Sequence, residues 1–232
     1  HIPTSEIINI DRNNLLPKVI DYACGAGHFL TEGYSRIKNG LIECAPEMLE
    51  CENWEEKVLF GVEKDYRLAR VSKIELFMHG AGNGNIVFGD GLEEHEDKGV
   101  VSNTFDILVA NPPYSVEAFK PHLKVKDDEF KILKYISNDG SEIETLFVER
   151  ISQLLKPNAV AAVILPDSIV RKDMYSFRAS REILLQNFEF KAIVRMESST
   201  FGKTGQPTAI MFLKKRDEPP KQFEMVQDIV EA

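Results

Sequence analysis

The stretch KVIDYACGAG, residues 18–27, joins a short apolar run to a glycine-rich turn. The run KVIDYA has the length of a buried strand, and His28–Arg36 can form a helix behind the turn. Glycine lets the backbone turn sharply and approach a ligand, and a following helix N-terminus favours an anion. The same turn also fits a plain strand-to-helix connection. Leu30 replaces the third glycine of a dinucleotide-binding fingerprint, which argues against an ordinary dinucleotide fold.

Short apolar runs alternate with amphipathic segments along most of the chain. Apolar residues recur at helical spacing over 66–79, from 143 to near 157, and over 175–187. Strands separated by helices imply a mostly parallel sheet with helices on both faces, so the expected fold class is α/β. Ligands of such sheets bind beyond the carboxyl ends of the strands. The further strands are expected at 58–63, 85–89, 105–110, 159–165, 190–196 and 209–214.

Length and composition limit the classes of protein to which the chain can belong. Its 232 residues are 43% hydrophobic and carry a net charge of −9, which suits one larger α/β domain and excludes wholesale disorder. The longest apolar run, residues 159–165, is too short to cross a membrane, and no signal peptide is visible. The acidic total argues against coating nucleic acid by charge alone. Neither the histidines nor Cys24, Cys44 and Cys51 show metal-ligand spacing, which predicts a reducing, cytoplasmic setting without disulfides or a metal.

Acidic residues follow each of the first three expected strands: Asp21, Glu63 and Asp90. An acid at the end of the second strand of a nucleoside-binding sheet typically accepts both ribose hydroxyls. Glu63 also fits a simple helix N-terminal charge, but Asp65 is the better cap and leaves Glu63 for a ligand. Asp90-Gly91 is also a common turn. At this edge, however, Asp90 could accept a hydrogen bond from an adenine amino group.

The fourth expected strand ends in Asn111-Pro112-Pro113-Tyr114, the most specific feature of the chain. Two prolines remove backbone donors and fix the turn, although a merely proline-rich strand exit would look the same. The Asn111 side chain and the Pro112 carbonyl could accept both hydrogens of an adenine amino group and stabilise the positive charge that develops when it attacks. Tyr114 could stack on the base for roughly 1–3 kcal/mol. The electrophile would be a sulfonium methyl, positioned in line, and the base would be flipped out of the duplex.

These stretches resemble the amino-group DNA adenine methyltransferases, in particular the modification subunits of type I and related restriction–modification systems. The matching stretches are 21–30, 61–65, 88–91, 111–114, 144–170 and 204–215. The resemblance implies a Rossmann-like sheet of about seven strands with an antiparallel last strand. It implies S-adenosylmethionine as methyl donor and a flipped adenine in DNA as substrate. It also implies a specificity subunit or target-recognition domain as partner, and could extend to a restriction subunit.

Residue roles carry over by position. The catalytic motif is Asn111, Pro112, Pro113 and Tyr114. The donor-binding residues are Asp21, Ala23, Cys24, Gly25, Ala26, Gly27, Glu63, Lys64, Asp90 and Gly91. Family members usually carry a Thr-Pro element before the glycine motif, and the reversed Pro3-Thr4 is the only similar pair, so we expect this element to be absent. Tyr22 and His28 replace a proline and a small residue that are more usual there.

The resemblance also divides the chain. We expect a methyltransferase core over residues 1–216, a mobile polar insertion over 115–142, and a tail over 217–232 that leads to a missing C-terminal region. Because the chain begins at His1, we expect further domains on either side. Arg171, Lys172, Arg178 and Arg181 form a basic segment that could contact phosphates. The segment 115–142 also contains five lysines, which we expect to be solvent-exposed rather than in contact with phosphates. They are Lys120, Lys124, Lys126, Lys131 and Lys134.

Two other functions stay open at this stage. Motifs of the Asn-Pro-Pro-Tyr type also act on protein glutamine amides and on RNA guanine amino groups. The chain could instead be a catalytically silent methyltransferase fold that serves in assembly or DNA binding, although the intact set of acids and Asn111 speaks for retained chemistry.

Overall fold

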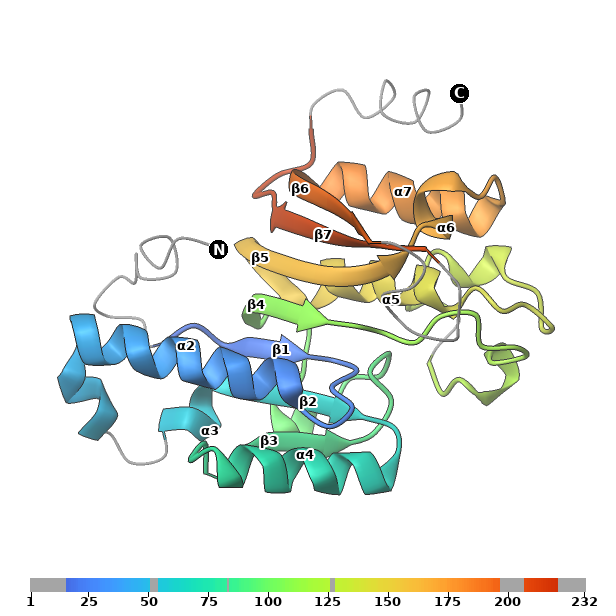
Figure 1. Cartoon of the computed structure of the whole chain (residues 1–232). Coiled ribbons are helices and arrows are strands. Elements are labelled where there is room, and N and C mark those ends of the chain that lie inside the picture. Colours follow the sequence, from blue (N-terminus) through green and yellow to red (C-terminus); the bar gives the residue numbers. More distant parts are fainter. Residues whose placement is uncertain (1–15, 51–53, 83, 126–127, 197–206, 221–232) are drawn as a thin grey trace.

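Seven strands form one open sheet in the order β3-β2-β1-β4-β5-β7-β6 (Figure 1). The computed structural model describes residues 16–50, 54–82, 84–125, 128–196 and 207–220. β7 is antiparallel to both β5 and β6, whereas the other paired strands are parallel. The predicted α/β sheet and its antiparallel last strand are confirmed. The strands are β1 (Val19–Asp21), β2 (Leu59–Glu63), β3 (Asn85–Phe88), β4 (Phe105–Ala110), β5 (Leu155–Pro166), β6 (Phe188–Met196) and β7 (Thr208–Lys215).

Helices cover both faces of the sheet. Successive strand residues point to opposite sides of the sheet, and apolar residues of both sets are buried beneath helices. Val19 and Leu59 belong to a core with helices α2 (His28–Cys44), α3 (Trp54–Val58) and α4 (Tyr66–Met78). Their neighbours Ile20 and Phe60 belong to a larger core on the other face, with α5 (Ile143–Leu154) and α7 (Tyr175–Asn187). The remaining short helices are η1 (Pro46–Glu50), η2 (Glu96–Lys98), η3 (Lys120–His122), η4 (Leu133–Tyr135) and α6 (Ser168–Arg171).

Two element boundaries differ clearly from expectation. Helix α2 runs on to Cys44 instead of ending at Arg36, because Leu41 continues its buried face. Strand β5 starts at Leu155, directly after α5, because Leu155 already pairs with Phe105 of β4.

The segment after β4 corrects the expectation of a mobile polar insertion over residues 115–142. Apolar side chains from it are buried in the larger core, and they are Phe119, Phe130, Ile132, Leu133 and Ile136. The Lys120 ammonium donates to the carbonyls of Leu133 and Ile136 at 3.0 and 2.6 Å, so this lysine is structural rather than solvated. The lysine-rich composition conceals these contacts because the buried positions show no regular period.

Several expectations lie outside the described residues. They concern Pro3-Thr4, Cys51, Lys126, residues 204–206 and most of the expected tail. Among the described helices, none is both long and apolar enough to cross a membrane.

Gly61 of β2 and Gly33 of α2 make a matched test of this packing. A methyl group on Gly61 would lie within 2.6–3.0 Å of Ile86, Leu30 and Cys24, whereas one on Gly33 meets no atom within 4 Å. Gly61→Ala is expected to lower the free energy of unfolding by about 1–3 kcal/mol through overpacking. Gly33→Ala should raise it by about 0.5–1 kcal/mol, because alanine favours a helix. Urea unfolding measures both, and equal stability of the two variants would contradict the close packing of α2 on β2.

Candidate methyl-transfer site

The carboxyl ends of β1, β2, β3 and β4 bring the predicted site residues to one edge of the sheet. Asp21 pairs with Gly61 two residues before Glu63, and Glu63 pairs with Phe88 two residues before Asp90. On the other side of β1, Ile20 pairs with Leu108, three residues before Asn111. Residues from four separate stretches therefore line the same edge, as expected from their positions after the strands.

The turn after β1 is built around the Asp21 carboxylate. Asp21 is 1% exposed, and its Oδ1 accepts a hydrogen bond from the Ala23 N–H at 3.0 Å. The Gly27 N–H donates to the Cys24 carbonyl at 2.7 Å, and Gly27 has a φ of +91°, which suits glycine. A Cβ at Gly27 would also collide with Ser72 of α4. The glycine thus permits both the turn and the close approach of α4.

Glu63 at the end of β2 links the first two strand-end turns. Its Oε2 accepts from the Gly25 N–H at 2.8 Å and its Oε1 from the Asp65 N–H at 2.7 Å. Asp65 caps α4 by accepting from the N–H groups of Arg67 and Leu68, as predicted. Each Glu63 oxygen has a further lone pair, so both remain able to accept a hydroxyl.

Asp90, after β3, is held on both carboxylate oxygens. Oδ1 accepts from the Leu92 N–H at 3.1 Å, and Oδ2 forms an ion pair with the Lys64 ammonium at 2.7 Å. The next residue, Gly91, lies so close to the Tyr22 carbonyl that any Cβ would clash with it. The turn after β3 is therefore packed directly against the turn after β1.

The turn after β4 presents a mixture of exposed and buried groups. Pro112 is buried, whereas Asn111 and Pro113 are exposed and Tyr114 is half-buried. The Asn111 amide and the Tyr114 ring are thus accessible to a ligand at the sheet edge. Ser115 and Ala118, further along the loop, have φ values of +56° and +47°.

Comparison with known proteins identifies the family of this chain. Residues 4–229 match the family described as N-6 DNA Methylase. The chain belongs to the N-6 DNA methylase family. It is 24% identical to the type II restriction enzyme and methyltransferase RM.Eco57I of Escherichia coli, over 91% of this chain and 26% of that protein. It is 25% identical to the type I restriction enzyme MpnII methylase subunit of Mycoplasma pneumoniae, over 93% of this chain and 39% of the relative.

Solved structures show the same fold. The crystal structure of the type I restriction enzyme EcoKI M protein superposes with a TM-score of 0.67 and 21% identity, over 86% of this chain and 40% of that one. A putative class I S-adenosylmethionine-dependent methyltransferase from Listeria monocytogenes superposes with a TM-score of 0.64 and 19% identity, over 94% of this chain and 60% of the other. This N-6 DNA methylase chain thus has the fold of S-adenosylmethionine-dependent methyltransferases. It spans 26% and 39% of the two curated relatives' lengths.

Helix α5 supplies site contacts that the sequence does not reveal. The Tyr22 hydroxyl donates to the Phe147 carbonyl at 3.3 Å, and the two rings stack at 5.1 Å. The buried Arg150 guanidinium donates to the carbonyls of Gly91 and Glu93 at 3.3 and 2.8 Å. Glu144 accepts from the Ser115 N–H at 3.0 Å. The apolar spacing of α5 identifies a helix but not the target of any of these groups.

The basic segment after β5 has fewer cations available for DNA than its composition suggests. Arg171 pairs with Asp167 and Arg178 with Asp173, each at 2.5 Å. Arg181 donates to the carbonyls of Ile169 and Lys172 at 2.9 Å, so it supports α6. The Lys172 ammonium lies 5.2 Å from the Phe177 ring. The expectation of a phosphate-binding cluster is therefore weakened, because three guanidinium groups are engaged within the chain.

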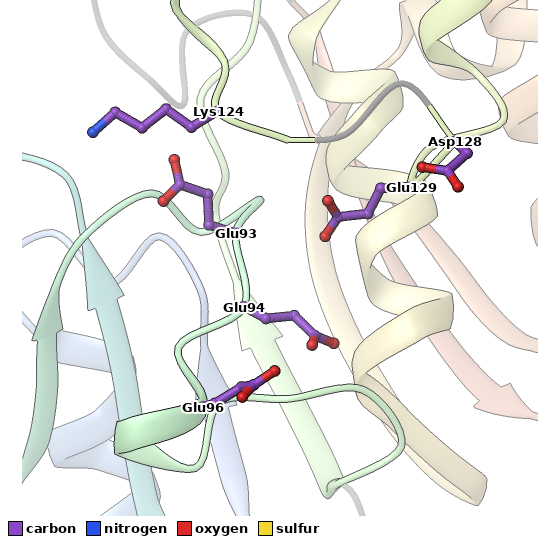
Figure 2. A pocket seen from close by; sticks show the side chains of 6 residues that line it. All are labelled: Glu93, Glu94, Glu96, Lys124, Asp128 and Glu129. Atoms are coloured by element: carbon purple, nitrogen blue, oxygen red, sulfur yellow. The ribbon is translucent and has the colours of Figure 1, made fainter.

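A hollow beside the turn after β3 is strongly acidic (Figure 2). Its lining residues are Glu93, Glu94, Glu96, Lys124, Asp128 and Glu129. A surface with this excess of carboxylates disfavours contact with phosphates. Within the described part of the chain, no group of three or more His, Cys, Asp or Glu side chains could hold a metal ion.

Burial changes the acidity of two residues at and just after the end of β1, Asp21 and Cys24. It raises the pKa of Asp21 from 3.8 to about 7, and the charge of Glu63 adds to the rise while the Ala23 N–H opposes it. Burial also raises the pKa of the Cys24 thiol to about 12, which keeps this thiol protonated and unreactive. Asp21 is therefore costly to ionise until a cation is placed beside it.

The Asp21 pKa predicts how the stability of the ligand-free protein depends on pH. The pKa of this carboxyl rises from 3.8 in the unfolded chain to about 7 in the folded protein. Its contribution to the free energy of unfolding is therefore complete below pH 3.8 and is lost as the pH rises through about 7. Asp21→Asn should remove this pH dependence and melt at a higher temperature than the wild type above pH 7. The amide oxygen can still accept from Ala23. The measurement is the melting temperature of both proteins as a function of pH. The same pH dependence in the wild type and in Asp21→Asn would contradict the prediction.

Proposed function

We propose that this chain is the catalytic core of an enzyme that transfers a methyl group from S-adenosylmethionine to the N6 amino group of adenine in DNA. The observation that carries the proposal is the placement of Asn111-Pro112-Pro113-Tyr114 at the end of β4, beside the buried Asp21 at the end of β1. The neighbouring strands β1 and β4 thus bring the acceptor groups of Asn111 and Pro112 close to the Asp21 carboxylate. Among the described residues, Asp21 has no cationic partner.

The donor half fits a cationic nucleoside. The buried Asp21 carboxylate suits an ammonium group, since a neighbouring cation offsets the cost of its ionisation. Glu63 keeps lone pairs for two ribose hydroxyls. Asp90 lies in the next turn, where an adenine amino group would share its Oδ2 with Lys64. S-adenosylmethionine, when bound, supplies an electrophilic methyl group on sulfur.

The acceptor half acts by hydrogen bonding and stacking. The Asn111 side-chain oxygen and the Pro112 carbonyl would accept hydrogen bonds from the two amino hydrogens, which draws the nitrogen lone pair out of the ring system. As the new C–N bond forms, the bond between the methyl group and sulfur would break and sulfur would leave as a neutral thioether. The two acceptors would stabilise the positive charge on nitrogen until it loses one hydrogen as a proton. Tyr114, half-buried at the edge, stacks on the flipped base. Positioning the base in line with the methyl group accounts for much of the expected rate.

DNA recognition is proposed to come from outside this chain. The net charge of −9, the internally paired arginines and the acidic hollow provide little grip on phosphates. The names of the relatives place them in type I and type II restriction systems. We therefore assign this chain to the modification part of a cytoplasmic restriction–modification system, with a specificity subunit or target-recognition domain as partner and a restriction subunit as a further one.

Asn111→Ala separates chemistry from donor binding. Loss of one preorganised acceptor should lower the methylation rate by roughly 10²–10³-fold. Calorimetry with S-adenosylmethionine should give unchanged affinity, because Asn111 lies after β4 and the donor groups lie after β1, β2 and β3. Asn39→Ala, on an exposed part of α2, is the matched control.

Radiolabelled methyl transfer to DNA, RNA and peptide substrates gives the complementary measurement. Label in DNA adenine is expected, and label in RNA or peptide alone would contradict the proposed substrate. Unchanged methylation by Asn111→Ala would contradict the proposed role of the motif.

A further inference from the structure

Helix α5 is buried along almost its whole length although it contains three charged side chains. Residues 143–151 are all buried, and Glu144, Glu149 and Arg150 are 1%, 4% and 0% exposed. Burying a charged group is costly unless a specific partner compensates it. The partners of these three side chains therefore show which parts of the molecule α5 holds in place.

Glu144 is directed at the loop that carries the acceptor motif. Its Oε2 accepts a hydrogen bond from the Ser115 N–H at 3.0 Å, and Ser115 follows Tyr114 directly in the chain. A bond from a carboxylate to a backbone N–H is charge-assisted and stronger than one between neutral groups. This contact joins two elements 29 residues apart in the sequence.

The loop beyond Tyr114 has a backbone shape that local sequence does not favour. Ser115 and Ala118 have φ values of +56° and +47°, in the left-handed region that residues with a Cβ rarely adopt. The prolines restrict the chain only at 112 and 113. A contact from outside the loop is therefore needed to keep this shape, and Glu144 provides one directly behind Tyr114.

We propose that Glu144 is a positioning residue for methyl transfer. Its carboxylate holds the Ser115 backbone, and through it orients the Tyr114 ring and the Asn111 amide toward the flipped base. This inference rests on the proposed function of the same site and adds a residue from a different element to it. Glu144 itself does not touch the substrate.

The same helix contains a matched control. Glu149 has the same charge and similar burial, and burial raises the pKa of both carboxyl groups. Its oxygens accept from the N–H groups of Lys131 and Ile132 at 2.8 and 3.0 Å, in the segment that packs against the core. Removing either carboxylate leaves backbone N–H groups unpaired. Of the two, it is Glu144 that contacts the loop of Tyr114 and Ser115.

The test compares Glu144→Ala, Glu144→Gln and Glu149→Ala in the complete protein with its partner subunits. Glu144→Ala should lower kcat by roughly 10²-fold, as expected for misplacement of reacting groups. Its S-adenosylmethionine dissociation constant should be unchanged. Glu144→Gln should restore most of the rate, because an amide oxygen can still accept from Ser115. Glu149→Ala should keep the wild-type kcat while losing thermal stability.

Three outcomes would overturn the inference. They are an equal loss of kcat in Glu144→Ala and Glu149→Ala, a loss of donor affinity that matches the loss of kcat, and no recovery in Glu144→Gln. A wild-type protein that methylates no adenine would instead refute the proposed function.

Hydrogen exchange of the backbone amides tests the contact between Glu144 and Ser115 independently of activity. The Ser115 amide of the wild type should exchange more slowly than those of Val116 and Glu117, and equal rates would refute the contact even if Glu144→Ala fails to fold.

Discussion

The burial of charged groups in α5 is the constraint on which the site depends. Each buried charge needs a partner, and Glu144 and Arg150 both bind backbone groups, in the turns after β4 and β3. Arg150 also donates to the side chain of Gln153. Tyr22 adds a third link, from the turn after β1 to the Phe147 carbonyl. One helix in the larger core therefore couples three turns at the carboxyl edge of the sheet. The packing that stabilises the domain also sets the relative positions of these turns.

The turn after β1 holds a buried carboxylate at a cost to the folded protein. Asp21 is almost fully buried, and its pKa rises to about 7, so ionisation is unfavourable without a cation nearby. A permanent lysine or arginine partner would remove this cost but would also compete with a cationic ligand. The site instead surrounds Asp21 with the Ala23 N–H and the Glu63 carboxylate, a setting that favours a transient cation. Under the proposed function, the same buried carboxylate that would bind a cationic donor also lowers the stability of the ligand-free fold when it ionises.

The distribution of charge explains how an acidic domain can belong to a DNA-modifying family. Carboxylates are concentrated at the ends of β1, β2 and β3 and around the hollow beside Glu93 and Glu129. Arg171 and Arg178, which composition alone would assign to DNA, form ion pairs within the chain, and Arg181 binds backbone carbonyls of α6 and the residue after it. The chemistry of a flipped base requires hydrogen-bond acceptors and a stacking surface rather than many cations. An acidic domain is therefore compatible with the proposed methyl transfer to a flipped base.

The sequence by itself determined the class of the fold, the edge of the sheet that carries the site and the residues that line this edge. These features follow from local rules, since apolar period, glycine turns and residues directly after strands report on nearby backbone. The tertiary structure alone decided that residues 115–142 contribute to the core, that the arginines after β5 pair internally, and that Glu144 and Arg150 brace the site turns. Those facts depend on which distant groups meet, such as Glu144 and Ser115 across 29 residues, and no local pattern specifies the partner of a buried charge.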